Sequence, residues 1–192
     1  MMEHSELELQ LVKQQYQLAQ AVIELSQGVA LRPILQHVGE ISKDLTGARY
    51  AMLAYIEGGE KIYIPVGMSE EELAGMDSGV PEGIGLLGLM WNQHEVVRVN
   101  NISRHDKAAG FPADHPPMTT FLGAPIMFGD EVQGVIYLTE KEGGRAFTPL
   151  DENVVTTLAS ACAVAISNAT HIQQLKDRNA ELEHLLAKKG KK

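Results

Sequence analysis

Cysteine is almost absent from this chain of 192 residues, which has one, Cys162. A single thiol excludes an internal disulfide, a CxxC redox pair and a cysteine-built zinc or iron–sulfur site within one chain. Cys162 lies in a run of small and apolar residues, which favours a packed position in a helix.

Basic residues and long apolar runs are also few. Lysine and arginine number 16 against 25 aspartates and glutamates, and four of the lysines stand in the last five residues. An acidic body repels phosphate backbones, so we expect no nucleic-acid partner. No apolar run approaches the roughly 18 residues of a membrane span. The acidic first ten residues do not resemble a signal peptide, so we expect a cytoplasmic protein without a membrane partner.

Motifs of the common catalytic classes are missing. The sequence has no Walker phosphate loop, no HExxH and no GxSxG elbow. Gly83, Gly85 and Gly88 match GxGxxG, but no long strand precedes them and no acidic residue stands where a ribose would need one, so tight packing explains them better. We therefore expect no enzyme of these classes.

The apolar and glycine patterns that are present predict an α+β fold, with a central antiparallel sheet, helices on its faces and long N- and C-terminal helices. Residues 100–119 contain three prolines and few apolar residues, which predicts a long loop. We divide the chain into an N-terminal helix (1–28), a central domain (29–168) and a C-terminal helix with a basic tail (169–192). The predicted strands are 50–56, 61–66, 96–99, 120–128 and 132–139, and the predicted helices are 3–27, 33–45, 70–76, 83–91 and 149–187.

The C-terminal helix carries a heptad seam. Its members step by three and four residues, and they are Ile172, Leu175, Asn179, Leu182 and Leu186. An asparagine at an a position favours a parallel, in-register pair of helices. We expect a homodimer through the terminal helices, and the alternative is that this helix packs on the N-terminal helix of its own chain.

One of the seven histidines stands out by its neighbours. His115 precedes Pro116 and Pro117, and a proline keeps the residue before it extended, so His115 is presented from a non-helical arm of the long loop. On chemistry alone, a loop histidine is also compatible with an exposed polar residue.

The order of elements resembles a GAF domain, the small-molecule sensor module that precedes kinases, cyclases and transcription factors. Within that family, GFPADHPPM (110–118), FLGAP (121–125) and GVIYLTEK (134–141) resemble the haem-binding GAF domain of DevS/DosS-type sensor histidine kinases. Asp114 departs from the pattern, since a histidine often occupies its position in that group.

The resemblance implies a b-type haem with iron bound by His115 and Tyr137 on the distal side. It implies a sensor of a diatomic gas (O2, NO or CO) or of redox state in a two-component system, with a histidine kinase, fused or separate, as output partner. The apolar residues that we expect to line the haem pocket are Leu86, Leu87, Met90, Trp91, Met118 and Phe121.

Three alternatives remain open at this point. The first is a GAF module that binds an anion or a small organic molecule without haem. The second is a GAF-type reductase of free methionine sulfoxide, which the single cysteine disfavours because that chemistry uses several. The third is a purely structural dimerisation module. Because no kinase segment is present, the chain is either a fragment of a longer sensor or a free-standing protein.

Overall fold

The computed structural model describes residues 19–20, 31–74, 85–108 and 118–189. Most of the helix predicted over 3–27 lies outside these residues, and so does His115. Part of the long loop predicted over 100–119 also lies outside them. The architecture below concerns the described residues only.

Five antiparallel strands form one sheet in the order β2-β1-β5-β4-β3. Each strand lies within two residues of its predicted bounds, and both predicted hairpins, β1–β2 and β4–β5, are confirmed. Because β1 pairs with β5, the two hairpins join into a continuous sheet with β5 at its centre. The strands are β1 (Ala48–Glu57), β2 (Glu60–Val66), β3 (Val97–Val99), β4 (Phe121–Phe128) and β5 (Glu131–Lys141).

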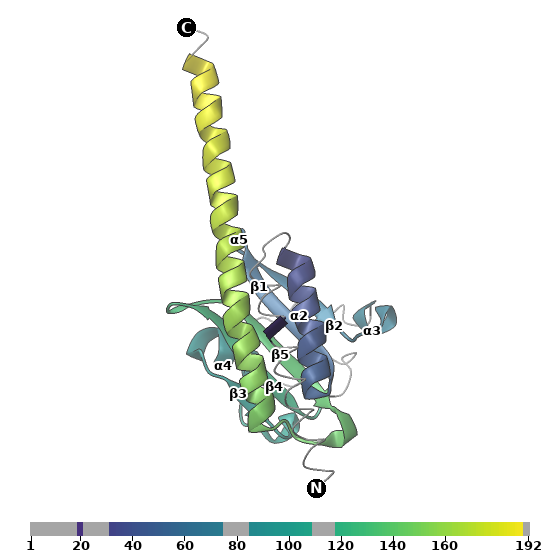
Figure 1. Ribbon diagram of the computed structural model, residues 1–192. Helices are drawn as coiled ribbons and strands as arrows, with labels where there is room; N and C mark the ends of the chain where they lie inside the picture. The colour runs from purple at the N-terminus through teal and green to yellow at the C-terminus, as the bar shows by residue number, and fades with distance from the viewer. Residues whose placement is uncertain (1–18, 21–30, 75–84, 109–117, 190–192) are drawn as a thin grey trace.

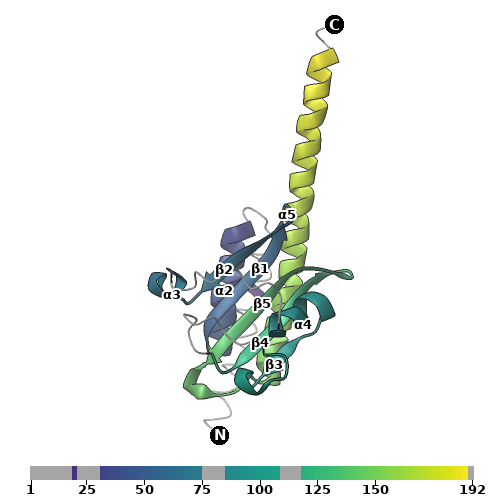
Figure 2. The same ribbon diagram turned by 180° about the vertical axis from the view of Figure 1, so that it is seen from behind.

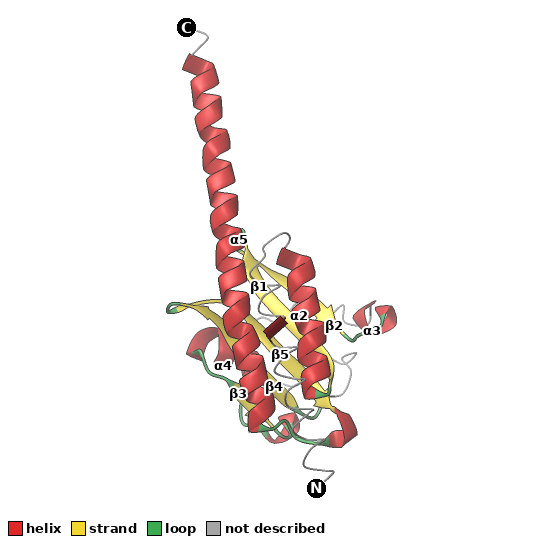
Figure 3. Cartoon of the chain, in the orientation of Figure 1, coloured by secondary structure: helices red, strands yellow, loops and turns green. Residues whose placement is uncertain are grey.

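Helices cover both faces of this sheet, as the sequence predicts. Two long helices, α2 and α5, lie side by side on one face (Figure 1), and α4 lies on the other (Figure 2). Figure 3 shows the resulting layers, with the yellow strands behind the two long red helices. The α-helices are α2 (Leu31–Thr46), α3 (Glu70–Ala74), α4 (Gly85–Gln93) and α5 (Pro149–Lys189).

The alternation of side chains along the strands produces two separate apolar cores. In β5, Ile136 and Leu138 belong to the core beneath α2 and α5, whereas Val135 and Tyr137 belong to the core beneath α4. This period of two follows from the pleat, which sends successive side chains to opposite faces. Cys162 of α5 is fully buried in the first core, and burial raises the pKa of its thiol to about 12. The packed helical position predicted for it is confirmed.

Two helix starts follow the chemistry that the sequence indicates. Ser69 and Glu72 form a reciprocal capping box at α3, in which the Glu72 amide donates to Ser69 Oγ (3.2 Å) and the Ser69 amide donates to Glu72 Oε2 (2.8 Å). At α5, the Asp151 amide donates to Thr148 Oγ1 (3.2 Å) and the Thr148 amide donates to Asp151 Oδ2 (2.6 Å). Both caps satisfy amides that the first helical turn leaves without partners.

Helix α5 is long and apolar enough over Pro149–Leu186 to cross a membrane, judged by length and composition alone. The sequence did not suggest this, because polar residues interrupt its apolar ones. Of its most apolar 18-residue window, 44% is buried inside the domain. Packing of α5 on the sheet therefore accounts for part of the apolar character of the helix.

Candidate functional site

Seven of the eight residues singled out from the sequence lie together in the core beneath α4. They come from α4, from the end of the long loop and from strands β4 and β5, and they span more than fifty positions of the chain. The eighth, His115, lies outside the described residues. The seven are Leu86, Leu87, Met90, Trp91, Met118, Phe121 and Tyr137.

The floor of this cluster is a row of residues across the sheet. Tyr137 of β5 stands opposite Met52 of β1 on one side and Gly123 of β4 on the other, and Gly123 faces Val97 of β3. The Tyr137 ring stacks on the ring of Phe121, with 5.7 Å between the centroids and 21° between the planes. The two rings thus form one wall of nearly parallel aromatic surface.

Helix α4 closes the cluster from above. It buries Leu86, Leu89 and Met90 against the sheet, which explains why the segment is apolar nearly all round. Met90 fits because Gly123 has no side chain: a Cβ there would lie 2.4 Å from Met90 Sδ. Gly85 begins the helix with φ 66°, a conformation that favours glycine. The antiparallel sheet also confirms that GxGxxG is not a dinucleotide-binding motif here, because that motif requires a parallel βαβ unit.

The structure adds residues that the sequence analysis did not identify. Ile102 lies in a 3₁₀ turn (Ile102–Arg104) within the segment predicted as loop, and it is buried in this cluster. Tyr63 of β2 packs on the cluster, and Lys61 Nζ lies 4.6 Å from the centre of the Trp91 ring. Lys61 and Tyr63 are two residues apart on a predicted strand, which indicates that they share a face. Nothing in the sequence places that face beside α4.

The tyrosines of this face are held neutral. Burial raises the pKa of Tyr137, and the neighbouring Tyr63 raises it further. Burial also raises the pKa of Tyr63. A neutral phenol in an apolar surrounding can donate a hydrogen bond to a bound ligand.

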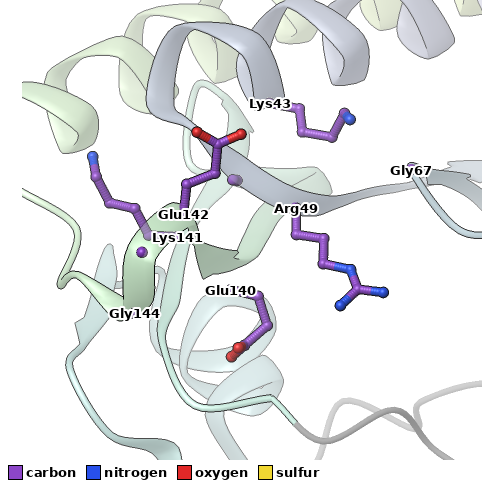
Figure 4. A pocket seen from close by; sticks show the side chains of 9 residues that line it. Lys43, Arg49, Gly67, Glu140, Lys141, Glu142 and Gly144 are labelled. Carbon is purple, nitrogen blue, oxygen red and sulfur yellow. The ribbon is translucent and has the colours of Figure 1, made fainter.

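A polar cleft of about 460 Å³ lies at the end of the sheet where β1 begins and β5 ends (Figure 4). Of its charges, Lys141 pairs with the buried Asp151, and Glu140 accepts hydrogen bonds from the Thr119 and Thr120 amides. None of the seven described residues predicted for the site lines this cleft, and its members were not identified from the sequence. The lining residues are Lys43, Ala48, Arg49, Gly67, Glu140, Lys141, Glu142, Gly143 and Gly144.

The described part of the chain contains no group of three or more histidine, cysteine, aspartate or glutamate side chains arranged to hold a metal ion. The cluster beneath α4 consists mainly of apolar and aromatic residues, so a ligand on this face would be held mainly by apolar contact. This agrees with the general composition of small-molecule sites, which are mostly apolar with a small number of placed polar groups.

Comparison with known proteins identifies the fold. A family model described as GAF domain matches residues 30–167. The chain belongs to the GAF domain family. The GAF fold expected from the order of its elements is thereby confirmed, and such domains are generally regulatory and bind ligands.

Solved structures share this GAF fold at low sequence identity. The GAF domain of the phosphoenolpyruvate-protein phosphotransferase from Coxiella burnetii has a TM-score of 0.71 at 21% identity, covering 84% of this chain and 96% of that one. The corresponding domain from Acinetobacter has a TM-score of 0.68 at 22% identity, covering 83% and 96%. Free methionine-R-sulfoxide reductase from Neisseria meningitidis has a TM-score of 0.64 at 14% identity, covering 81% and 89%. At such identities the likeness concerns the fold alone.

Proposed function

We propose that this GAF domain is a sensor that binds b-type haem between the α4 face of the sheet and the loop that carries His115. In this proposal His115 binds the iron and Tyr137 lies on the distal side. The bound group would supply an iron centre that takes up a diatomic gas (O2, NO or CO) or changes oxidation state.

The observation that carries the proposal is the convergence of seven residues on one face of the sheet. They are distributed from α4 to β5, yet they form one apolar cluster with stacked aromatic rings. A large planar apolar group suits such a surface, because burying apolar area is the main favourable term in binding it. The apolar and aromatic character of the residues described on this face supports a haem ligand.

Tyr137 has the chemistry expected of a distal residue. Tyr137 is partly buried, and its raised pKa keeps the hydroxyl neutral. A hydrogen bond from such a donor would stabilise a polar gas ligand or an ordered water. His115 would supply an imidazole nitrogen, the usual axial ligand of a b-type haem.

The output of the sensor would pass through helix α5. Strand β5 carries Tyr137 and ends at Lys141, whose ammonium pairs with Asp151 in the first turn of α5. A displacement of β5 would therefore reach α5 through one buried ion pair. We propose that the chain acts in the cytoplasm as a homodimer through its terminal helices and signals to a histidine kinase, fused or separate.

One observation favours a second candidate, a GAF domain that binds an anionic small molecule without haem. The polar cleft presents Lys43 and Arg49 on the side away from Lys141 (Figure 4), so an anion could bind between these cations. Arg49 lies 3.5 Å from Glu72 and is mostly exposed, which weakens its attraction for a ligand.

A reductase function is the weakest alternative. Although a methionine sulfoxide reductase shares the fold, Cys162 is fully buried in α5 and its raised pKa keeps it a thiol. A buried thiol of high pKa is a poor nucleophile, since the thiolate is the reactive form. We therefore propose a regulatory role without catalysis.

The test is an absorption spectrum of the full chain expressed with added haem, before and after dithionite and carbon monoxide. We expect a Soret band that shifts with reduction and again with carbon monoxide. His115→Ala should abolish haem retention and leave the thermal unfolding of the apo-protein unchanged. His171→Ala is the matched control. Because His171 lies exposed on α5, this variant should retain haem fully.

Two results would contradict the proposal. A colourless protein that also fails to take up haemin would refute haem binding and favour the second candidate, an anionic ligand. Retention of haem at wild-type stoichiometry by His115→Ala would remove His115 as the ligand, even if haem itself remained.

A further inference from the structure

The edge strand β2 presents two polar side chains to the α4 face of the sheet. Tyr63 packs against the cluster beneath α4, and it stands opposite Ala54 of β1, which is buried in the same cluster. Lys61 comes two residues before Tyr63, and successive side chains of a strand alternate between its faces. Lys61 and Tyr63 therefore lie on the same face, with Lys61 nearer the β1–β2 turn.

The Lys61 ammonium lies at the rim of this face. Its Nζ is 4.6 Å from the centre of the Trp91 ring, which is a cation–π distance. Trp91 belongs to α4 and packs against the cluster, whereas Lys61 is exposed. The indole ring therefore holds a positive charge beside the apolar cluster, at a point where the cluster meets solvent.

The polarity of this face changes in steps from the interior to the rim. Burial raises the pKa of Tyr137, and the neighbouring Tyr63 raises it further, so the two phenols lie close together. Burial also raises the pKa of Tyr63, so both phenols are neutral near pH 7. Neutral phenols in the partly buried positions and a cation in the exposed one suit a ligand with an apolar body and an anionic end.

Haem b has this division of polarity. Its macrocycle is planar and apolar, and its propionate carboxylates stand together on one edge. Burying a carboxylate without a partner costs free energy, so this edge of the group favours a rim that offers a cation or water. An ammonium donates a charge-assisted hydrogen bond to a carboxylate, which is stronger than a hydrogen bond between neutral groups.

We propose that Lys61 binds a propionate carboxylate of the haem in the α4 site, so that the carboxylate edge of the group lies toward β2. Lys61 Nζ donates the hydrogen bond, and the Trp91 ring positions the ammonium. This role rests on the proposed function and adds a specificity to it. Among planar apolar ligands, the site prefers those that carry a carboxylate.

Binding of haemin and of haemin dimethyl ester to the full chain tests this role, because the ester keeps the iron and the macrocycle but lacks the anionic carboxylates. Titrations followed at the Soret band give the dissociation constants. Lys61→Met should weaken haemin binding about fivefold, as expected for an exposed ion pair, and leave ester binding unchanged. Lys61→Arg keeps the positive charge and should restore haemin binding.

Lys176→Met is the matched control, because Lys176 is exposed on α5 and lies outside the cluster. It removes the same charge and should change neither dissociation constant. A loss that is confined to haemin and is recovered by Lys61→Arg would support the proposal.

The contrary outcomes separate this role from haem binding itself. Equal dissociation constants of the wild type and Lys61→Met for haemin would overturn the role of Lys61 and leave haem binding intact. An equal loss for haemin and for the ester would also overturn it, because Lys61 would then act on packing and not on a carboxylate. A wild-type chain that binds neither probe would refute the proposed function, and the role of Lys61 with it.

Discussion

The Tyr137 ring stacks on the Phe121 ring, with 5.7 Å between the centroids and 21° between the planes, although the two residues are not direct register partners on the neighbouring strands β5 and β4. Phe121 is opposite Thr139, so the contact is diagonal across the β4–β5 pair. Gly123, the direct partner of Tyr137, has no side chain and leaves room for the phenol to lean on Phe121. The orientation of the Tyr137 phenol is therefore set by packing.

Tyr137→Phe tests the distal role of that hydroxyl. We expect the variant to keep haemin and to lose one hydrogen bond to the gas ligand, worth about 1 kcal/mol or about fivefold in affinity. The measurement is the O2 dissociation constant and the rate of autoxidation, with Tyr55→Phe as the control because Tyr55 is buried in the opposite core. Unchanged values in Tyr137→Phe would refute the distal assignment.

The raised pKa of Tyr137 predicts a loss of stability in alkali. The folded pKa lies above the ordinary 10.0, so the neutral phenol contributes stability that is fully present below pH 10 and is lost as pH rises above it, when the unfolded chain ionises first. Urea unfolding measured from about pH 8 to pH 11 should show this fall. The unfolding free energy of Tyr137→Phe should fall less steeply with pH than that of the wild type. Parallel curves of unfolding free energy against pH for the two proteins would contradict the burial of the phenol.

Local patterns were sufficient to predict most of the fold. The β1–β2 turn contains Gly58 and Gly59, with φ 60° and 88°, the combination that a tight hairpin turn of two positive-φ residues requires. The caps of α3 and α5 each involve residues three apart in sequence. Turns and caps of this kind depend on residues only a few positions apart, so they can be predicted from a single sequence.

Contacts between distant elements could not be predicted in this way. The polar cleft combines Lys43 of α2, Arg49 of β1 and Glu142 after β5, and no spacing in the sequence indicates that these residues meet. Lys61 of β2 lies over Trp91 of α4, and nothing in the sequence indicates that these two elements meet. The seven predicted site residues came from family resemblance, because periodicity alone does not indicate that they share one face. The structure places them in one cluster, and their role in binding a ligand stays a prediction.

The ion pair between Lys141 and Asp151 predicts a large stability effect from a single change. Their side chains are 10% and 8% exposed, so Lys141→Met leaves the Asp151 carboxylate buried without its cation and should cost about 3 kcal/mol. Glu152→Gln is the control: its partner Arg98 is about one third exposed, and such a pair is worth less than about 1 kcal/mol. Equal losses of unfolding free energy in the two variants, measured in urea, would show that the Lys141–Asp151 pair stabilises the start of α5 no more than the Arg98–Glu152 pair does.

Two glycines of the sheet predict a graded response to the same added methyl group. In Gly123→Ala the new Cβ would meet Met90 Sδ at 2.4 Å, and a methionine side chain can shift, so we expect a loss of about 1–3 kcal/mol. In Gly134→Ala it would meet the Ala54 carbonyl oxygen at 2.4 Å, which belongs to the β1–β5 ladder and cannot move without breaking strand pairing. The Gly134 variant should therefore be the less stable of the two in urea.

The double variant Gly123→Ala/Met90→Ala decides whether the methionine causes the first loss. Because Met90 is fully buried, Met90→Ala alone should destabilise the domain by about 2–5 kcal/mol through the cavity it leaves. If the added Cβ fills part of that cavity, the double variant will lose less free energy of unfolding than the two single variants lose together. We expect the difference, which is the coupling energy between the two changes, to be about 0.5 kcal/mol or more. Strict additivity would mean that Met90 does not pack against the sheet at Gly123, and that the apolar site beneath α4 is more open than the described side chains make it.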